Sequence, residues 1–279
     1  DGFFRIATTM GNSGAGDNRS ENNLYILDET LHETGKIEGL APGERIYSVR
    51  FAGKRGYVVT FRTVDPLFVL DLDPHEPRVL GALKIPGYSN YLHPVDENHI
   101  IGFGKNTTEL PGGRTPADGA GTAIDLGMKM ALFDVTDVAH PIELFKEEIG
   151  DRGTDSELLY NHKALLFSRE KDLIAFPVTV REVRDANANG KAVPQYGELT
   201  FLGAFVYSFD LSQGFRLKGK ITHLSDGDLL KSGYATYDRN KQIERILYID
   251  NHLYTVSRVM IKANDLDTLK ELNSLTLAK

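Results

Sequence analysis

Side chains that carry oxygen alternate along residues 185–191, in the sequence DANANGK. Carboxylate and amide oxygens at alternate positions can converge on one hard cation, while the glycine permits a sharp turn and a backbone carbonyl adds a ligand. Tyr196 stands at position twelve, where an EF-hand loop carries glutamate, and Glu198 lies two residues further on. We therefore predict a calcium site without flanking helices, with a metal-free Asn- and Gly-rich turn as the alternative. The predicted ligands are Asp185, Asn187, Asn189, Lys191 and Glu198.

Histidines and further carboxylates form a second group of candidates. His93 in YLHP and His162 in YNHK lie near the start of predicted innermost strands, where they could act as ligands or bases. His223, Asp226 and Asp228 open a long polar insert and are predicted to bind a ligand there. The alternative for each histidine is a structural side chain held by hydrogen bonds.

Several classes of chemistry are absent from the sequence. The chain has no cysteine, which excludes thiolate nucleophiles and Fe–S clusters, and it contains no P-loop, nucleophile elbow, HExxH or dinucleotide glycine motif. Its net charge of -7 and pI near 5.6 argue against nucleic acid. No apolar run reaches the roughly 18 residues of a membrane span.

The elements that must position these residues follow from an internal repeat. Five segments each consist of an apolar strand that ends in aspartate, a polar turn and a second strand. Aspartate suits such a turn because its carboxylate accepts hydrogen bonds from nearby backbone amides. The strand-end aspartates are Asp28, Asp71, Asp134, Asp210 and Asp265.

A second hairpin precedes each of the last four segments, for example residues 157–178 (ELLYNHKALLFSREKDLIAFPV). Joined in order, the hairpins form four-stranded antiparallel meanders, the pattern of β-propeller blades. We predict an all-β chain with about five blades, the first of which lacks its innermost strand. Residues 1–279 are expected to form a single β-propeller domain, the C-terminal part of a longer protein. Two β-sandwiches are the alternative. Residues 267–275, DTLKELNSL, have helical propensity, but their place in the repeat predicts a strand.

Long polar inserts fall at equivalent places in the repeat. Residues 11–21, 105–127 and 181–198 join the second strand of a blade to the third, and residues 225–242 join two blades. Strand direction alternates in a meander, so these connections are expected on one face of the propeller. Loops on a rigid scaffold are where binding residues concentrate.

Residues 56–105 (GYVVTFRTVDPLFVLDLDPHEPRVLGALKIPGYSNYLHPVDENHIIGFGK), together with LFDVTDVAHPIEL and NHKALLFSREKDLIAFPV, carry a family resemblance. They resemble the prokaryotic family of secreted proteins with a C-terminal β-propeller domain, distantly related to WD-repeats. The resemblance runs from about Asn23 to Leu277 and implies an exported or membrane-anchored protein with a further N-terminal region. It adds no catalytic residues.

Two functions are compatible with these features. The first is an extracellular or cell-surface binding module whose insert-bearing face engages a protein, a cell-wall polymer or a glycan, with calcium as the candidate cofactor. The alternative is a hydrolase or lyase, similar to a glycosidase, with a pocket at the central channel. The lack of a catalytic motif favours binding, and the fold itself is compatible with both.

Overall fold

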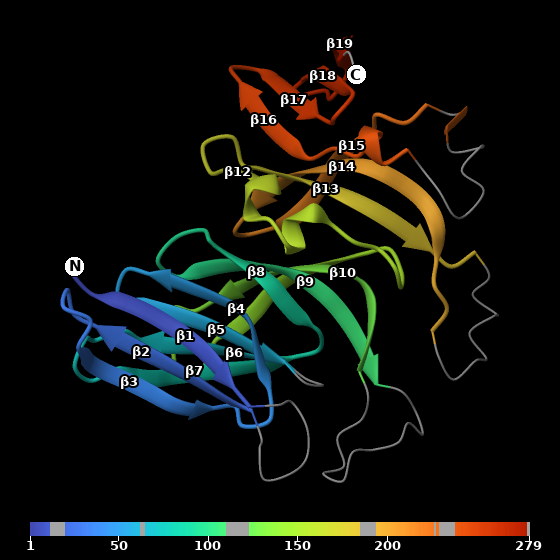
Figure 1. Cartoon of the computed structure of the whole chain (residues 1–279). Helices are drawn as coiled ribbons and strands as arrows, with labels where there is room; N and C mark the ends of the chain where they lie inside the picture. Colours follow the sequence, from blue (N-terminus) through green and yellow to red (C-terminus); the bar gives the residue numbers. More distant parts are fainter. Residues whose placement is uncertain are drawn as a thin grey trace. The chain divides into compact units, whose positions relative to one another are not determined.

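The computed structural model describes residues 1–11, 20–61, 65–109, 123–184, 194–225, 227–228 and 238–277. Its strands form five antiparallel sheets in chain order, and the strands of each sheet are neighbours in sequence (Figure 1). The first sheet has three strands and the other four sheets have four each. The predicted β-propeller meanders are thereby confirmed, including the first sheet with one strand fewer.

The strands have the following bounds. The first sheet holds β1 (Phe4–Met10), β2 (Glu21–Leu27) and β3 (Glu33–Leu40). The second holds β4 (Arg45–Ala52), β5 (Arg55–Phe61), β6 (Asp65–Asp71) and β7 (Arg78–Ile85). The third holds β8 (Tyr88–Pro94), β9 (His99–Glu109), β10 (Ala123–Asp134) and β11 (Ile142–Ile149). The fourth holds β12 (Leu166–Ser168), β13 (Leu173–Glu182), β14 (Glu198–Asp210) and β15 (Gly214–Ile221). The fifth holds β16 (Arg245–Ile249), β17 (His252–Val256), β18 (Met260–Asp265) and β19 (Glu271–Thr276).

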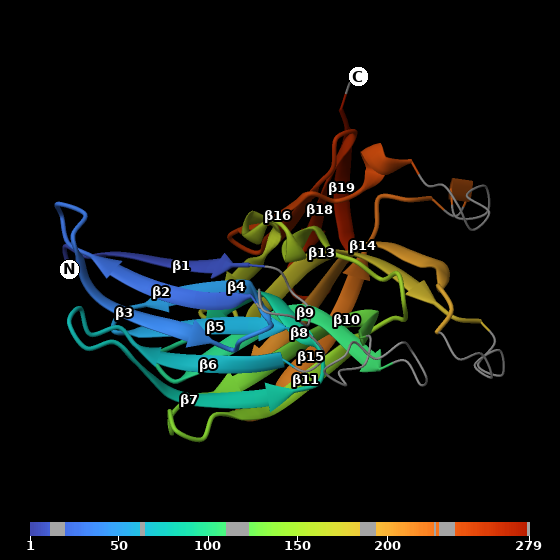
Figure 2. The ribbon, with the colours of Figure 1, turned by 60° about the horizontal axis from the view of Figure 1, so that its bottom comes forward.

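The chain divides into two compact units. Unit 1 comprises Asp1–Asp125 and Lys129–Leu144, and unit 2 comprises Leu126–Met128 and Phe145–Lys279. Unit 1 holds the first two sheets and most of the third (Figure 2), whereas unit 2 holds the fourth and fifth sheets.

Strand position within a sheet explains strand composition. The second strands β5 and β13 are buried along almost their whole length, which requires apolar residues on both faces and matches the runs GYVVTF and LIAFPVTV. Outer strands such as β7 and β15 include many exposed residues. The outer strand β19 is exposed throughout, so its polar sequence folds as a strand by pairing with β18, as predicted from the repeat.

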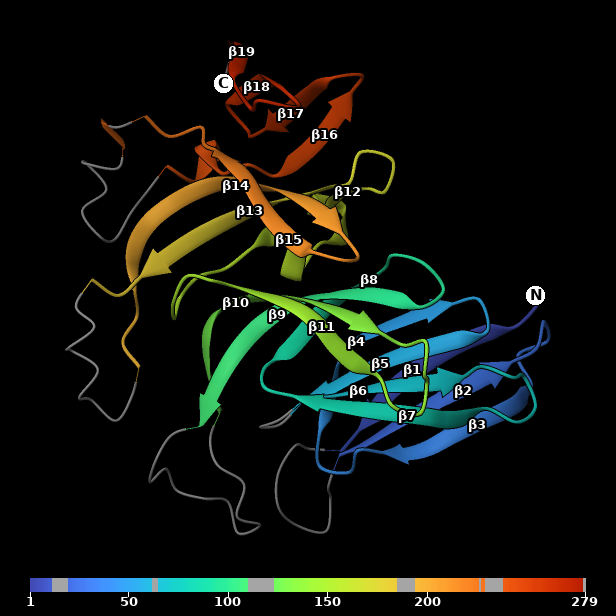
Figure 3. The ribbon, with the colours of Figure 1, turned by 180° about the vertical axis from the view of Figure 1, so that it is seen from behind.

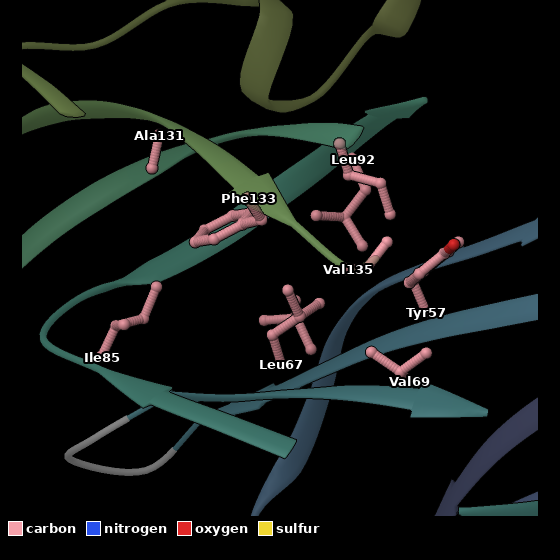
Figure 4. Close-up of a cluster of buried hydrophobic side chains, with 10 residues drawn as sticks. Tyr57, Leu67, Val69, Ile85, Leu92, Ala131, Phe133 and Val135 are labelled. Carbon is pink, nitrogen blue, oxygen red and sulfur yellow. The ribbon is translucent and has the colours of Figure 1, made fainter. Parts of the chain in front are cut away.

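Each unit has a core between adjacent sheets. In unit 1, Phe133 and Ala131 of β10 lie opposite side chains of β5 and β6, among them Tyr57 and Val69 (Figure 4). In unit 2, Val206 of β14 belongs to a cluster that joins the fourth and fifth sheets. The apolar positions that alternate along the strands therefore fasten neighbouring sheets together face to face.

The strand-end aspartates take the predicted turn geometry. The Oδ1 atom of Asp134 accepts a hydrogen bond from the backbone N–H of Thr136 at 2.7 Å, and Asp210 accepts one from Ser212 at 2.7 Å. Asp28, Asp71 and Asp265 accept backbone N–H bonds in the same way. The side-chain hydroxyl of Thr136 is the main factor that lowers the pKa of Asp134. The repeat thus reflects a strand-end aspartate that accepts a backbone N–H bond in all five turns, from two residues on in four of them and from three residues on at Asp265.

Candidate functional site

The fourth sheet contains the main departure from the predicted strands. The apolar pattern of residues 157–168 predicts one strand of a hairpin, but these residues form the 3-10 helices η1 (Glu157–Leu159) and η2 (His162–Ala164), followed by the three-residue strand β12. Asn161 precedes η2, and its side-chain oxygen accepts the N–H of Lys163. Short polar caps of this kind offer the backbone an alternative to a sheet ladder, so the strand prediction was wrong for residues 157–165. Residues 166–168 form the predicted strand and pair with β13.

The link between β11 and β12 is nevertheless attached firmly to β13. Thr154 is fully buried; its hydroxyl accepts the N–H of Arg181 at 2.9 Å and donates to the Arg181 carbonyl at 3.1 Å. One residue on, Asp155 and Thr179 exchange both backbone hydrogen bonds, at 2.8 and 2.9 Å. Ser156 then caps η1 and donates its hydroxyl to the Pro177 carbonyl at 2.5 Å. These bonds hold the link against the end of β13 that leads into the 183–197 segment.

A tyrosine and an arginine form the rim of this region. The Arg152 guanidinium lies 4.4 Å from the centre of the Tyr196 ring and donates to the Pro194 carbonyl at 2.7 Å. Tyr196 itself is 70% exposed. Gly153 has φ +98°, and a Cβ atom there would lie 2.8 Å from Cδ of Arg181 and 2.9 Å from Cδ1 of Tyr196. Only glycine therefore permits this turn to lie so close to the ring.

A polar pocket of about 350 Å³ opens between the link, β13 and the segment before β16. We call it the β13 pocket. Its lining residues are Gly153, Asp155, Ser156, Glu157, Tyr160, Val178, Thr179, Arg181, Arg239 and Gln242. Two carboxylates and two guanidinium groups thus share one pocket beside a tyrosine that is 72% exposed, Tyr160. Such convergent polar groups on a rigid sheet are typical of a binding site.

Neighbouring side chains hold the two carboxylates of the pocket. The Tyr160 hydroxyl donates to Oδ1 of Asp155 at 3.3 Å, and the Asn161 amide donates to Oε1 of Glu157 at 3.1 Å. These two bonds orient the carboxylates within the pocket.

An ion pair between Lys241 and Asp228 anchors the segment that supplies Arg239 and Gln242. Lys241 Nζ lies 2.6 Å from Oδ2 of Asp228, which also accepts the N–H and hydroxyl of Ser225 at 2.8 and 2.7 Å. The Lys241 hydrogen bond is the largest of the interactions that hold the pKa of Asp228 well below its usual range. The carboxylate of Asp228 is therefore used to position η4 (Arg239–Lys241).

His223 is a buried link within unit 2. It is 3% exposed, its Nδ1 lies 2.9 Å from the Ser257 hydroxyl, and its Nε2 lies 2.9 Å from the Thr255 hydroxyl. Burial lowers the pKa of His223 to about 4, so the ring is neutral at pH 7. Both nitrogens are engaged inside the fold, which matches the structural alternative for this histidine.

His93 and His162 belong to different units. His93 is the penultimate residue of β8 in unit 1, so its predicted place near the start of the strand was wrong. Its Nδ1 lies 3.1 Å from the Tyr91 hydroxyl, and burial lowers its pKa to about 4, helped by the charge of Arg50. His162 is exposed as the first residue of η2 in unit 2.

Most of the predicted calcium site lies outside the described residues. Asp185, Asn187, Asn189 and Lys191 are in this group, as is Asp226 of the second candidate set. Glu198 is described, at the start of β14, and its Oε2 forms an ion pair with Nε of Arg184. Within the described ranges, no group of three or more His, Asp or Glu side chains is arranged to hold a metal ion. The calcium site stays a prediction.

A second pocket lies in unit 1, at the turns that join first to second strands. It measures about 680 Å³ and includes Lys54, Tyr57, Asp96 and Glu97. Arg55 crosses it, donating to the carbonyls of Glu97 and Val135, both at 3.3 Å. This pocket is larger than the β13 pocket, but the Arg55 guanidinium donates to two backbone carbonyls of the fold.

Sequence motifs carried no signal for the β13 pocket. Its residues come from three separated segments, 153–160, 178–181 and 239–242. The one local sign was the polar stretch GDRGTDSE (150–157), which interrupts an otherwise regular alternation of strands. The stretch precedes the residues that form 3-10 helices in place of the predicted strand.

The comparisons with known proteins agree with this architecture. A family model for the beta propeller domain matches residues 1–269. The chain belongs to the beta-propeller domain family. This propeller is similar to an uncharacterized protein of Archaeoglobus fulgidus, with 32% identity over 278 residues. It is also similar to the uncharacterized protein MJ1554 of Methanocaldococcus jannaschii, with 44% identity over 150 residues, or 53% of this chain. The first match covers 99% of this chain but 34% of the Archaeoglobus protein, and the second covers 21% of MJ1554.

Among solved structures, the propeller resembles a europium-containing methanol dehydrogenase with a TM-score of 0.54. The superposition covers 99% of this chain and 53% of that protein, at 8% sequence identity, so it shows the fold alone. In the part of the chain that the structure describes, no helix combines the length and apolar character needed to cross a membrane.

Proposed function

We propose that this propeller is a non-catalytic binding module that engages a protein partner through the β13 pocket and its tyrosine rim. One observation carries the proposal: polar side chains from three segments converge on a pocket flanked by Tyr160 and Tyr196, which are 72% and 70% exposed. Exposed tyrosines combine apolar area with a polar hydroxyl and are enriched where proteins meet. Propeller folds commonly present such sites on loops of a rigid scaffold.

The two pocket carboxylates support binding over hydrolysis. Asp155 and Glu157 each hold a neighbouring side chain of their own link, Tyr160 and Asn161 respectively, which is a structural task. A cell-surface location and a calcium ion in the 185–198 loop belong to the same proposal. In this scheme calcium would stiffen the loop that follows β13 and so restrict Tyr196.

Cross-linking of the purified chain with proteins from its own organism tests the proposal. We expect one main cross-linked partner, whose affinity falls about tenfold or more in Tyr196→Ala, the typical loss for an interfacial tyrosine. Leu31→Ala removes a side chain that is 71% exposed in unit 1 and serves as the matched control. Equal loss in both variants, or none in either, would contradict the assignment of the pocket.

For calcium, Asp185→Ala should abolish a rise in melting temperature produced by millimolar calcium. No rise in the unaltered chain would contradict the proposed calcium site.

A further inference from the structure

Three cationic side chains of unit 2 have acidic partners. Arg258 lies 2.7 Å from Glu244, Lys241 lies 2.6 Å from Asp228, and Arg184 is paired with Glu198. The chain as a whole has 39 acidic and 32 basic residues.

Arg181 and Arg239 do not follow this pattern. No carboxylate of the described residues lies within 4.0 Å of either guanidinium group, although both groups line the β13 pocket. Arg181 uses one nitrogen, Nη1, to donate to the Gly197 carbonyl at 3.3 Å. Arg239 is the first residue of η4, and its side chain is exposed. Each guanidinium carries five N–H donors, so most of the donor capacity in the pocket is unused by the described part of the chain.

The position of Arg181 is fixed by the fold. Its backbone N–H and carbonyl are both bonded to Thr154, and its Cδ packs against Gly153. The guanidinium itself is oriented by the bond from Nη1 to the Gly197 carbonyl, so it loses less side-chain entropy when it binds an anion. This favours recognition of a planar carboxylate by paired hydrogen bonds.

Resting on the function proposed above, we propose that Arg181 and Arg239 bind a side-chain carboxylate from an acidic peptide segment of the partner protein. Asp155 and Glu157 then accept the N–H groups of the same segment, and the exposed Tyr196 ring covers its apolar carbons. A glutamate or aspartate residue in a peptide presents a carboxylate and N–H donors a few ångströms apart, which matches a pocket that contains both charges.

The two carboxylates also determine what the pocket rejects. A phosphate group or a polyuronate chain brings two or more negative charges to a pocket that already holds Asp155 and Glu157. Like charges in one partly desolvated site raise the free energy of the complex. A single carboxylate with N–H groups beside it avoids that cost.

The test uses the whole chain and four small probes: N-acetyl-glutamate N-methylamide, its glutamine analogue, galacturonate and inorganic phosphate. Binding is followed by NMR through the arginine Nε–Hε signals and the Gly153 amide. We expect the glutamate probe to shift the Arg181 and Arg239 signals with a Kd in the millimolar range, and the glutamine analogue to bind at least about fivefold more weakly.

The variants Arg181→Gln and Arg239→Gln should each weaken the glutamate probe about fivefold or more, whereas Arg258→Gln, which removes a paired arginine, should leave it unchanged. Arg239 is exposed, so its variant keeps the test valid if Arg181→Gln unfolds. Equal binding of both peptide probes, tighter binding of galacturonate or phosphate, or no binding of the glutamate probe would each overturn this inference. If the glutamate probe fails while Tyr196→Ala still abolishes the protein complex, the binding function stands and the carboxylate chemistry is wrong.

Discussion

The second and fourth sheets are built alike in their outer three strands and differ in the innermost strand. In the second sheet, β4 pairs with β5 from Arg45 to Ala52. In the fourth sheet, the short strand β12 (Figure 3) pairs with β13 over Leu166–Ser168 only. The rest of that edge is held by the Asp155–Thr179 bridge. A complete inner strand covers the edge of its neighbour, whereas an interrupted one leaves space. The β13 pocket occupies that space.

The outer strands of the two sheets correspond closely. Val69 of β6 faces Gly81 of β7, and Val206 of β14 faces Gly219 of β15. A β-bulge follows both valines, after Val69 and after Val206. The blade can therefore change its inner strand without changing its outer three, since the core that joins sheets is built largely from the middle strands.

The largest expected effect tests whether the outer three strands of the second and fourth sheets contribute equally to stability. Val69→Ala and Val206→Ala each remove two methyl groups from a fully buried side chain. We expect each to lower the free energy of unfolding of its unit by about 2–3 kcal/mol, from lost burial and the cavity that remains. Urea unfolding at pH 7 measures both, and a difference of more than about 1.5 kcal/mol between them would show that the two valines are not equivalent.

The next effect concerns the inner edges of the two sheets, where they differ. Gly53 in the second sheet and Gly153 before the fourth sheet allow a matched pair of substitutions. Gly53, between β4 and β5, has φ +59°, and a Cβ atom added there would have no other atom within 4 Å, so Gly53→Ala should cost about 1 kcal/mol of backbone strain. Gly153→Ala adds contacts below 3.0 Å to Arg181 and Tyr196, and we expect about 2–3 kcal/mol.

Gly153→Ala should also displace the Tyr196 ring and weaken partner binding, whereas Gly53→Ala should leave binding unchanged. Thermal unfolding followed by circular dichroism measures the first effect, and the cross-linking assay measures the second. Equal costs in the two variants would show that the close approach at the pocket rim is not needed.

The smallest effect is a pH dependence carried by one histidine in each unit. The pKa of His93 on β8 and of His223 in the link that follows the fourth sheet is about 4, below the value of about 6.5 in an unfolded chain. The unfolded chain therefore binds more protons in this window, and stability falls as the pH drops from about 6.5 towards 4. Between pH 7 and 5.5 each histidine should account for about 1 kcal/mol of lost stability.

His223→Gln should remove about 1 kcal/mol of that pH dependence while lowering stability at pH 7, because two buried hydroxyls lose their partner. Urea unfolding at several pH values measures both. An unchanged slope in His223→Gln would show that folding does not lower the pKa of His223.

The repeat and its turns could be predicted from local sequence. Short strands with period-two or continuous apolar patterns, each third strand closed by an aspartate, leave few alternatives to a four-stranded meander, because both signals depend on residues close together in the chain. Asp134 and Asp210 took their predicted roles for that reason. The same local reasoning failed at residues 157–165, where the caps of Ser156 and Asn161 stabilise 3-10 turns that bury the apolar residues Leu158 and Leu159.

The β13 pocket, by contrast, depends on long-range contacts. Arg181, Arg239 and Glu157 are far apart in sequence and carry no motif; the pocket forms because Thr154 and Asp155 fasten a polar link to β13 and Asp228 holds η4 beside it. The role of His223 also depends on long-range contacts. A histidine beside two aspartates suggested a ligand site, but whether a ring nitrogen meets a ligand or a buried hydroxyl depends on side chains 32 and 34 residues away, which local sequence does not specify.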